Sequence, residues 1–167
     1  AEFEAAVRNS SYSAYDSGRR PAYVAQIGCV DDVIGAVLFA AEQGKRITIC
    51  SGGHSWSQNH LRDEVLLIDL SRLNSIDIDT ANRTAVIGPG CVSAQLDAAL
   101  QKVGLFFPVA HAYTVGLGGF LLQGGFGWAS QVVGLGCENV VGIDVVLGDG
   151  RLVHANEVEN KDLLWAA

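Results

Sequence analysis

One short segment of the sequence, Ser51-Gly52-Gly53-His54-Ser55, has residue types suited to binding an anionic ligand. Two adjacent glycines permit a tight turn and a close approach of backbone to a ligand. Successive exposed N–H groups in such a turn form a concave site suited to a pyrophosphate, and the two serines add hydroxyl donors. The same residues are also typical of a plain Gly-Gly turn whose histidine is satisfied by local hydrogen bonds.

A second segment, Val115 to Trp128, contains six glycines within twelve residues. Such a segment allows backbone to lie against a flat ligand, while Phe120, Leu121, Leu122 and Phe126 are expected to anchor it in the core. Each glycine costs about 0.5–1 kcal/mol relative to alanine in regular structure, so we expect a large bound cofactor to compensate. A structural glycine-rich loop without a ligand is the alternative.

Common nucleotide and hydrolase motifs are missing. Gly116-x-Gly118 begins a G-x-G-x-x-G fingerprint, but Leu121 stands at its third glycine position, so a Rossmann site is not supported. The sequence contains no Walker lysine motif, no G-x-S-x-G and no H-E-x-x-H, which leaves a P-loop, an elbow-type serine hydrolase and a zincin without support.

The composition is that of one globular domain. The 167 residues are 49% hydrophobic and 17% charged, and no apolar run reaches the roughly 18 to 20 residues that span a bilayer. A net charge of −7 argues against nucleic acid as a partner. We therefore expect a soluble protein, and its composition fits a secreted or a cytoplasmic location equally.

The single cysteines and two of the histidines are predicted to have structural roles. Cys29, Cys50, Cys91 and Cys137 have apolar or glycine-rich neighbours and no zinc-site spacing, which predicts buried free thiols, with one disulfide as the alternative. His60 and His154 are predicted to be surface or loop residues.

The elements that must position these segments follow from hydrophobic spacing. Val30 to Ala41 repeats apolar residues at helical intervals and ends before Gly44, and Ser93 to Val103 is a second predicted helix that ends at Gly104. Asn160 is expected to cap a last helix within which the chain stops, which favours a fragment. The predicted strands are Arg46–Cys50, Val65–Leu70, Ser75–Asp79, Arg83–Ile87, Val140–Leu147 and Arg151–His154. This order predicts an α+β or mixed α/β protein.

A series of landmarks keeps one order along the chain and resembles a known family. The chain from Pro21 to Ala167 is similar to the FAD-binding domain of the vanillyl-alcohol oxidase superfamily, also called the p-cresol methylhydroxylase type. Within it, the berberine-bridge-like oxidases resemble the chain most, a group that includes glucooligosaccharide and 6-hydroxynicotine oxidases. The landmarks are Pro21-Ala22-Tyr23-Val24-Ala25, Ser51–Ser55, Val65–Asp69, Gly88-Pro89-Gly90, Thr114–Gly127, Glu138-Asn139-Val140, Asp149-Gly150 and Asp162–Ala166.

The resemblance implies an α+β fold of two small sheet-and-helix subdomains, incomplete at its C-terminus. Residues 1–20 would form an N-terminal arm, and residues 21–167 an FAD-binding domain truncated before its C-terminal part and the substrate domain. The remainder of a longer chain or a partner subunit would complete it.

The resemblance also implies a site. In such proteins the histidine of the serine-glycine-glycine-histidine loop is bonded covalently to the 8α-methyl carbon of FAD, and in this chain that residue would be His54. A neutral ring nitrogen suits addition to the 8α carbon. Bicovalent members have a cysteine where this chain has Ala112, so His54 is the single expected covalent attachment. His111 and Tyr113 flank that position and could reach the flavin, although core or supporting roles suit them as well. The cofactor-binding residues implied are Ser51, Gly52, Gly53, His54, Ser55, Thr114, Val115, Gly116, Gly119, Gln123, Gly124, Gly127, Trp128, Asn139 and Val140.

Two positions depart from the family pattern. Many relatives have histidine at the position of Phe120 and arginine at the position of Cys50, so contacts to the flavin edge and the phosphates are expected to differ here.

The expected function is that of an FAD-dependent oxidase. It would remove hydride from a C–H beside oxygen or nitrogen of a small molecule and pass the electrons to O₂, giving H₂O₂. The catalytic base is expected outside this chain, and no metal is expected. The rival hypotheses are a flavin-binding module without its own catalysis and a structural glycine-rich domain without a cofactor.

Overall fold

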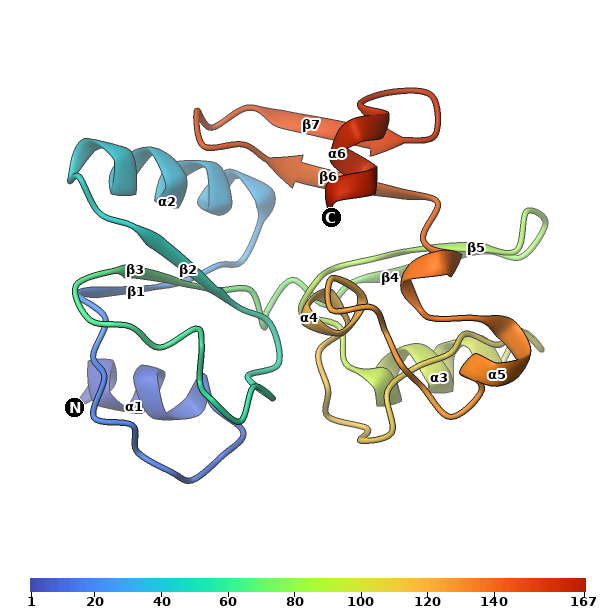
Figure 1. Cartoon of the computed structure of the whole chain (residues 1–167), viewed down its shortest axis with the longest axis horizontal. Helices are drawn as coiled ribbons and strands as arrows, with labels where there is room; N and C mark the ends of the chain where they lie inside the picture. Colours follow the sequence, from blue (N-terminus) through green and yellow to red (C-terminus); the bar gives the residue numbers. More distant parts are fainter.

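A computed structural model describes all 167 residues, which form three groups of secondary structure (Figure 1). None of the helices has the length and apolar character needed to cross a lipid bilayer. The elements in chain order are α1 (Glu2–Asn9), β1 (Tyr23–Gln26), α2 (Val30–Glu42), β2 (Ile47–Cys50), β3 (Leu66–Asp69), β4 (Ile76–Asp79), β5 (Thr84–Ile87), α3 (Ser93–Gln101), α4 (Leu117–Leu121), α5 (Ser130–Val133), the 3₁₀ turn η1 (Cys137–Asn139), β6 (Gly142–Val146), β7 (Leu152–Asn156) and α6 (Lys161–Ala166).

The first group is a parallel sheet in the order β1–β3–β2, with α2 over one face and α1 beneath the other (Figure 1). Because both faces are covered, every residue of the central strand β3 is buried. The α2 side is packed with Ile27, Ala36, Val37, Ala40, Leu66 and Ile68, and the α1 side with Val7, Cys50, Leu61 and Leu67.

Leu67 provides a test of this core. Its side chain is fully buried at the centre of β3 among Val7, Cys50 and Leu61. Leu67→Ala should lower the free energy of unfolding by about 2–5 kcal/mol, because the cavity closes only in part. Urea denaturation followed by circular dichroism measures the loss. Leu152→Ala, at a position 49% exposed, is the control and should cost about 0.5 kcal/mol or less. Equal losses in the two variants would contradict this description of the core.

The second group combines the antiparallel hairpin β4–β5 with α3 and α4. Cys91, Leu96, Leu100 and Leu117 form its core, against which the isoleucines of the hairpin pack. The hairpin turn is held by Asp79, whose Oδ1 accepts hydrogen bonds from the backbone N–H groups of Ala81 and Asn82.

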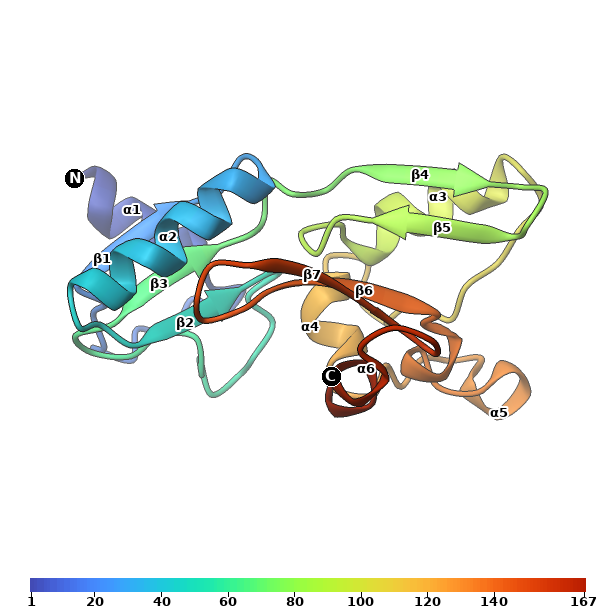
Figure 2. The ribbon, with the colours of Figure 1, turned by 90° about the horizontal axis from the view of Figure 1, so that it is seen from above.

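The third group is the hairpin β6–β7 with α6, and it extends from the second group toward α2 (Figure 2). Val146 packs against the core of the first group. At the hairpin turn, a Cβ added to Gly150 would lie 2.9 Å from Leu38 Cδ2 in α2. The hairpin therefore packs against the first group.

The predicted α+β class is confirmed, and the predicted helices and strands are present with ends that differ by at most two residues. Three local expectations were wrong or incomplete. The helices α1, α4 and α5 and the 3₁₀ turn η1 were not predicted. Asn160 does not cap α6 with its side chain, because its Nδ2 donates instead to the carbonyl of His154 at 2.6 Å. Leu122 and Phe126 are exposed rather than anchored in the core, whereas Phe120 does pack against it.

Two predictions of burial also need correction. All four cysteines are free, but Cys29 and Cys137 are exposed, and only Cys50 and Cys91 are buried thiols. His60 is buried rather than on the surface, because the turn from Gln58 to Leu61 folds against the α1 side of the sheet. Burial lowers the pKa of His60 and thereby favours its neutral form.

The cysteines predict a selective labelling pattern. Burial raises the pKa of Cys50 to about 12 and also raises that of Cys91, so both thiols stay protonated and shielded at about pH 8. Iodoacetamide should modify Cys29 and Cys137 in the native protein and all four thiols after unfolding, as mass spectrometry of digested peptides would detect. Rapid native labelling of Cys50 would contradict its burial.

Candidate functional site

The segment Ser51–Ser55 leaves the carboxyl end of β2, at the same sheet edge as Asp69 at the end of β3. Gly53 has a φ of +63°, and a Cβ there would lie 2.9 Å from the backbone carbon of Ser10. Its carbonyl accepts a hydrogen bond from the N–H of Tyr12 at 3.0 Å. Only glycine suits this position, which both turns the chain and packs against the N-terminal segment.

Gly52 brings the loop against the glycine-rich segment of the second group. A Cβ on Gly52 would lie 2.8 Å from Gly116 Cα, and one on Gly116 would lie 2.9 Å from Gly52 Cα. Ser51 Oγ donates to the carbonyl of Pro89 at 2.5 Å. The two segments that the sequence singled out therefore meet at the junction of the first and second groups.

His54 lies at this junction and is held on two sides. Its Nε2 is 2.9 Å from Thr114 Oγ1, across 60 residues of sequence. Its ring stacks on Tyr12, with centroids 4.1 Å apart and planes at 18°. Partial burial lowers the pKa of His54, and a hydrogen bond with the backbone of Thr114 opposes that shift. The imidazole is therefore neutral at about pH 7, the form in which a ring nitrogen has a free lone pair.

A polar hollow of about 240 Å³ opens beside Ser51 and Gly52. Asp69 is the buried carboxylate in its wall, and its Oδ1 accepts from the N–H of Ser71 at 3.0 Å. Neither Lys nor Arg lines the hollow, so its donors are hydroxyls, amides and backbone N–H groups. The lining residues are Asn9, Ser10, Cys50, Ser51, Gly52, Asp69, Ser71, Asn74, Gly90, Val92, Gln95 and Thr114.

The later predicted site residues lie apart from His54. Gln123 is exposed, and its Nε2 donates only to the neighbouring Leu122 carbonyl. Asn139 donates from Nδ2 to the carbonyls of Val133 and Leu135, so it stabilises the turn between α5 and η1. Val140 is partly buried and follows η1.

The glycines of this region have separate roles. Gly124 accepts a hydrogen bond from the N–H of Cys137, and Gly127 lies against the carbonyl of Val109. Gly119 has open space at its Cβ position. These glycines shape the segment between α4 and η1, while Gly116 alone touches the histidine loop.

Aromatic rings are exposed on the other side of the glycine segment. His111 stacks on Trp128, with centroids 3.9 Å apart and planes at 19°, and Phe126 lies edge-on to the same histidine. Trp128 is 80% exposed, and Tyr113 is also exposed. His111 and Tyr113 therefore have no core role. These rings offer flat apolar faces next to a hollow of about 200 Å³.

A family model described as an FAD binding domain matches residues 21–156. The chain belongs to this family. The match begins at Pro21, where the predicted resemblance also began, and it includes both segments that meet at His54.

Relatives of this FAD binding domain include curated and solved proteins. An FAD-linked oxidoreductase of Hypoxylon pulicicidum is 37% identical over 155 residues, which are 90% of this chain and 35% of the relative. The structure of 6-hydroxy-D-nicotine oxidase from Arthrobacter nicotinovorans is 31% identical, with a TM-score of 0.92 over 99% of this chain and 36% of that one. Glucooligosaccharide oxidase from Acremonium strictum, described with a 6-S-cysteinyl, 8α-N1-histidyl FAD, is 31% identical, with a TM-score of 0.86 over 95% of this chain and 34% of its own.

These likenesses confirm the predicted family and the p-cresol methylhydroxylase type of FAD-binding fold. The chain spans about a third of the length of the relatives it matches. The residues at the junction suit a flavin dinucleotide. Gly52 and Gly116 let the backbones of the two segments approach more closely than any Cβ would allow, and Ser51, Ser55 and Thr114 supply hydroxyls. Burial lowers the pKa of His54, which favours its neutral imidazole.

Sequence reasoning missed Tyr12 and the polar side chains of the hollow, such as Asp69, Asn74 and Gln95. They come from segments far apart in the chain, and of those named only Asp69 falls within a predicted landmark, Val65–Asp69.

Proposed function

We infer that the complete protein is an FAD-dependent oxidase and that its FAD lies across the junction between Ser51–Ser55 and the glycine segment. In this proposal His54 is bonded to the 8α carbon of the flavin. The observation that carries the proposal is the position of His54, whose Nε2 lies 2.9 Å from Thr114 Oγ1 at the point where the two glycine-rich segments meet.

The remaining proposed contacts follow from chemistry. The backbone of Gly52 and Gly53, with the hydroxyls of Ser51 and Ser55, would hold the pyrophosphate. Flat aromatic rings such as Trp128 would pack against flavin or substrate surfaces. Val115, Gly116, Gly119, Gln123, Gly124, Gly127, Asn139 and Val140 complete the proposed contact set.

Bound FAD would supply the redox chemistry by accepting hydride from a C–H beside oxygen or nitrogen and passing two electrons to O₂, which becomes H₂O₂. The residues of this chain would bind and orient the cofactor and exclude water from it. The names of the relatives, which include a xylooligosaccharide oxidase and a hydroxynicotine oxidase, support a small-molecule substrate. The catalytic base would come from a further part of the protein or from a partner subunit.

A second candidate function is a flavin-binding module without catalysis of its own. The observation that favours it is the chain's coverage of only about a third of its relatives.

Two measurements on the complete protein separate these functions. After denaturation and precipitation, flavin absorbance that stays with the polypeptide supports the covalent bond, and flavin that washes away contradicts it. Peroxide release is then measured with a panel of sugars, alcohols and amines. Release supports the oxidase, whereas a bound flavin that no substrate reduces supports the module.

A further inference from the structure

The N-terminal arm, residues 1–20, makes a direct contact with the proposed flavin-bonding residue. The ring of Tyr12 is stacked on the imidazole of His54, with centroids 4.1 Å apart and planes only 18° from parallel. The N–H of Tyr12 also donates to the carbonyl of Gly53, immediately before that histidine. Tyr12 is 60% exposed and belongs to none of the three hydrophobic cores, so core packing does not explain its position.

The arm is attached firmly on either side of Tyr12. Gln58 is buried, and its Nε2 donates to Ser11 Oγ at 2.9 Å and to the Tyr15 carbonyl at 2.7 Å. Arg19 donates to the carbonyl of Ser57 at 2.6 Å. These bonds connect the arm to the same loop that carries His54, so the loop and the arm are held as one unit.

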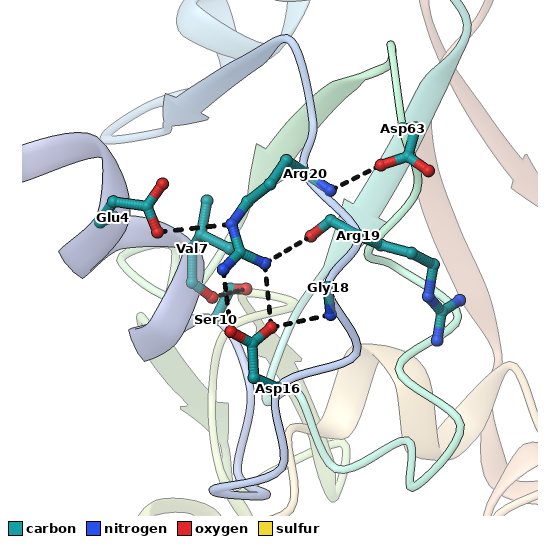
Figure 3. A network of polar contacts seen from close by, with 8 residues as sticks. All are labelled: Glu4, Val7, Ser10, Asp16, Gly18, Arg19, Arg20 and Asp63. Atoms are coloured by element: carbon teal, nitrogen blue, oxygen red, sulfur yellow. Dashed lines mark hydrogen bonds and ion pairs between the residues drawn. The ribbon is translucent and has the colours of Figure 1, made fainter.

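A polar network holds the far end of the arm (Figure 3). Arg20 forms ion pairs with Asp16 and Glu4, and its backbone N–H donates to Asp63 at 2.8 Å. Glu4 lies in α1, and Val7 of the same helix is buried in the core. The position of Tyr12 is thus determined by the fold on both sides.

Thr114 contacts the imidazole of His54 at a different point. Its Oγ1 is 2.9 Å from Nε2, and the backbone of Thr114 also forms a hydrogen bond with the imidazole. If Nε2 donates its hydrogen to Thr114, Nδ1 holds the free lone pair. Stacking sets the plane of the ring, and the hydrogen bond sets its rotation within that plane.

We propose that Tyr12 and Thr114 are positioning residues for covalent flavin attachment, which orient His54 so that its Nδ1 meets the 8α carbon of FAD. This inference rests on the proposed function. In the reaction, a C8α–H bond breaks and the C8α–Nδ1 bond forms. The imidazole gives up its Nε2 proton, and the isoalloxazine takes up two electrons and two protons. Dioxygen then removes them as H₂O₂, which restores the oxidised flavin.

The test uses the complete apoprotein, mixed with FAD, and follows the mass increase of the denatured polypeptide over time. Tyr12→Ala should slow attachment about two- to tenfold, which is the range expected for the loss of one stacked pair. Tyr12→Phe keeps the ring and should restore the wild-type rate. Tyr15→Ala is the matched control, because Tyr15 is an exposed tyrosine of the same arm whose ring is not stacked on His54. Circular dichroism checks that each variant is folded.

Thr114 is tested in the same assay. Thr114→Val removes the hydroxyl at similar volume and should slow attachment about tenfold, whereas Thr114→Ser should retain the rate. NMR of the isolated flavin peptide should identify Nδ1 as the bonded nitrogen in wild type and a mixture of both nitrogens in Thr114→Val.

The outcomes separate this inference from the proposed function. A wild-type protein that never gains the mass of FAD overturns both. If the wild-type protein gains the mass of FAD, and Tyr12→Ala gains it at the same rate as Tyr15→Ala, then Tyr12 has no positioning role. If Thr114→Val also keeps the wild-type rate and bonds only through Nδ1, the role of Thr114 falls as well.

Discussion

Replacing His54 with alanine is expected to abolish covalent retention of FAD completely while leaving the fold intact. His54 is the only histidine that contacts both Thr114 and the N-terminal arm at the junction of the glycine segments. Its ring is partly buried and belongs to none of the three hydrophobic cores, so its removal should cost little stability. The measurement is the flavin absorbance that remains with the precipitated, denatured protein.

His154→Ala is the matched control for this experiment. His154 is half-exposed on β7, where its Nδ1 contacts Asp144 at 2.7 Å, away from the glycine segments. This variant should retain all of its flavin. Flavin that stays bonded in His54→Ala would place the attachment on another residue, and a loss in both variants would indicate a general folding defect.

The helices and strands were predictable where the sequence pattern is local. The helix α2 repeats apolar residues on one face and ends before Gly44, whose φ of +60° stops it. The helix α1 has only a short apolar face, formed by Phe3, Ala6 and Val7, and Val7 is its only buried residue. Its partners Leu61 and Leu67 lie far along the chain, so only the folded protein shows why it forms.

The same distinction applies to the candidate site. The loop at Gly52-Gly53 and the segment at Gly116 were predictable because a glycine-dense run is unusual in itself and marks a close approach of backbone. Their mutual contact joins the loop after β2 to the residue that precedes α4, 64 positions along the chain, and no rule of sequence spacing predicts such a contact. His60 lies in a loop, as predicted, but its burial was not predicted for a related reason, since a lone histidine in a polar stretch gives no sign that its turn packs beneath a sheet.

The contact between the two glycine segments leads to the second large expected effect, that of Gly52→Ala. The new Cβ would lie 2.8 Å from Gly116 Cα and would also contact Gly116 N. Both are backbone atoms, which cannot move away by changing a rotamer. The loop must therefore shift, and His54 with it. We expect the free energy of unfolding to fall by about 1–3 kcal/mol and FAD binding to weaken by at least about tenfold.

Gly35→Ala distinguishes this effect from a general consequence of added methyl groups. Gly35 is exposed in α2 and has nothing within 4 Å of its Cβ position, so alanine there should stabilise the helix by about 0.5–1 kcal/mol. Urea denaturation and titration of the complete apoprotein with FAD measure both quantities. Wild-type affinity in Gly52→Ala would mean that the junction tolerates a side chain, and then the tight contact between Gly52 and Gly116 could not be what shapes the flavin site.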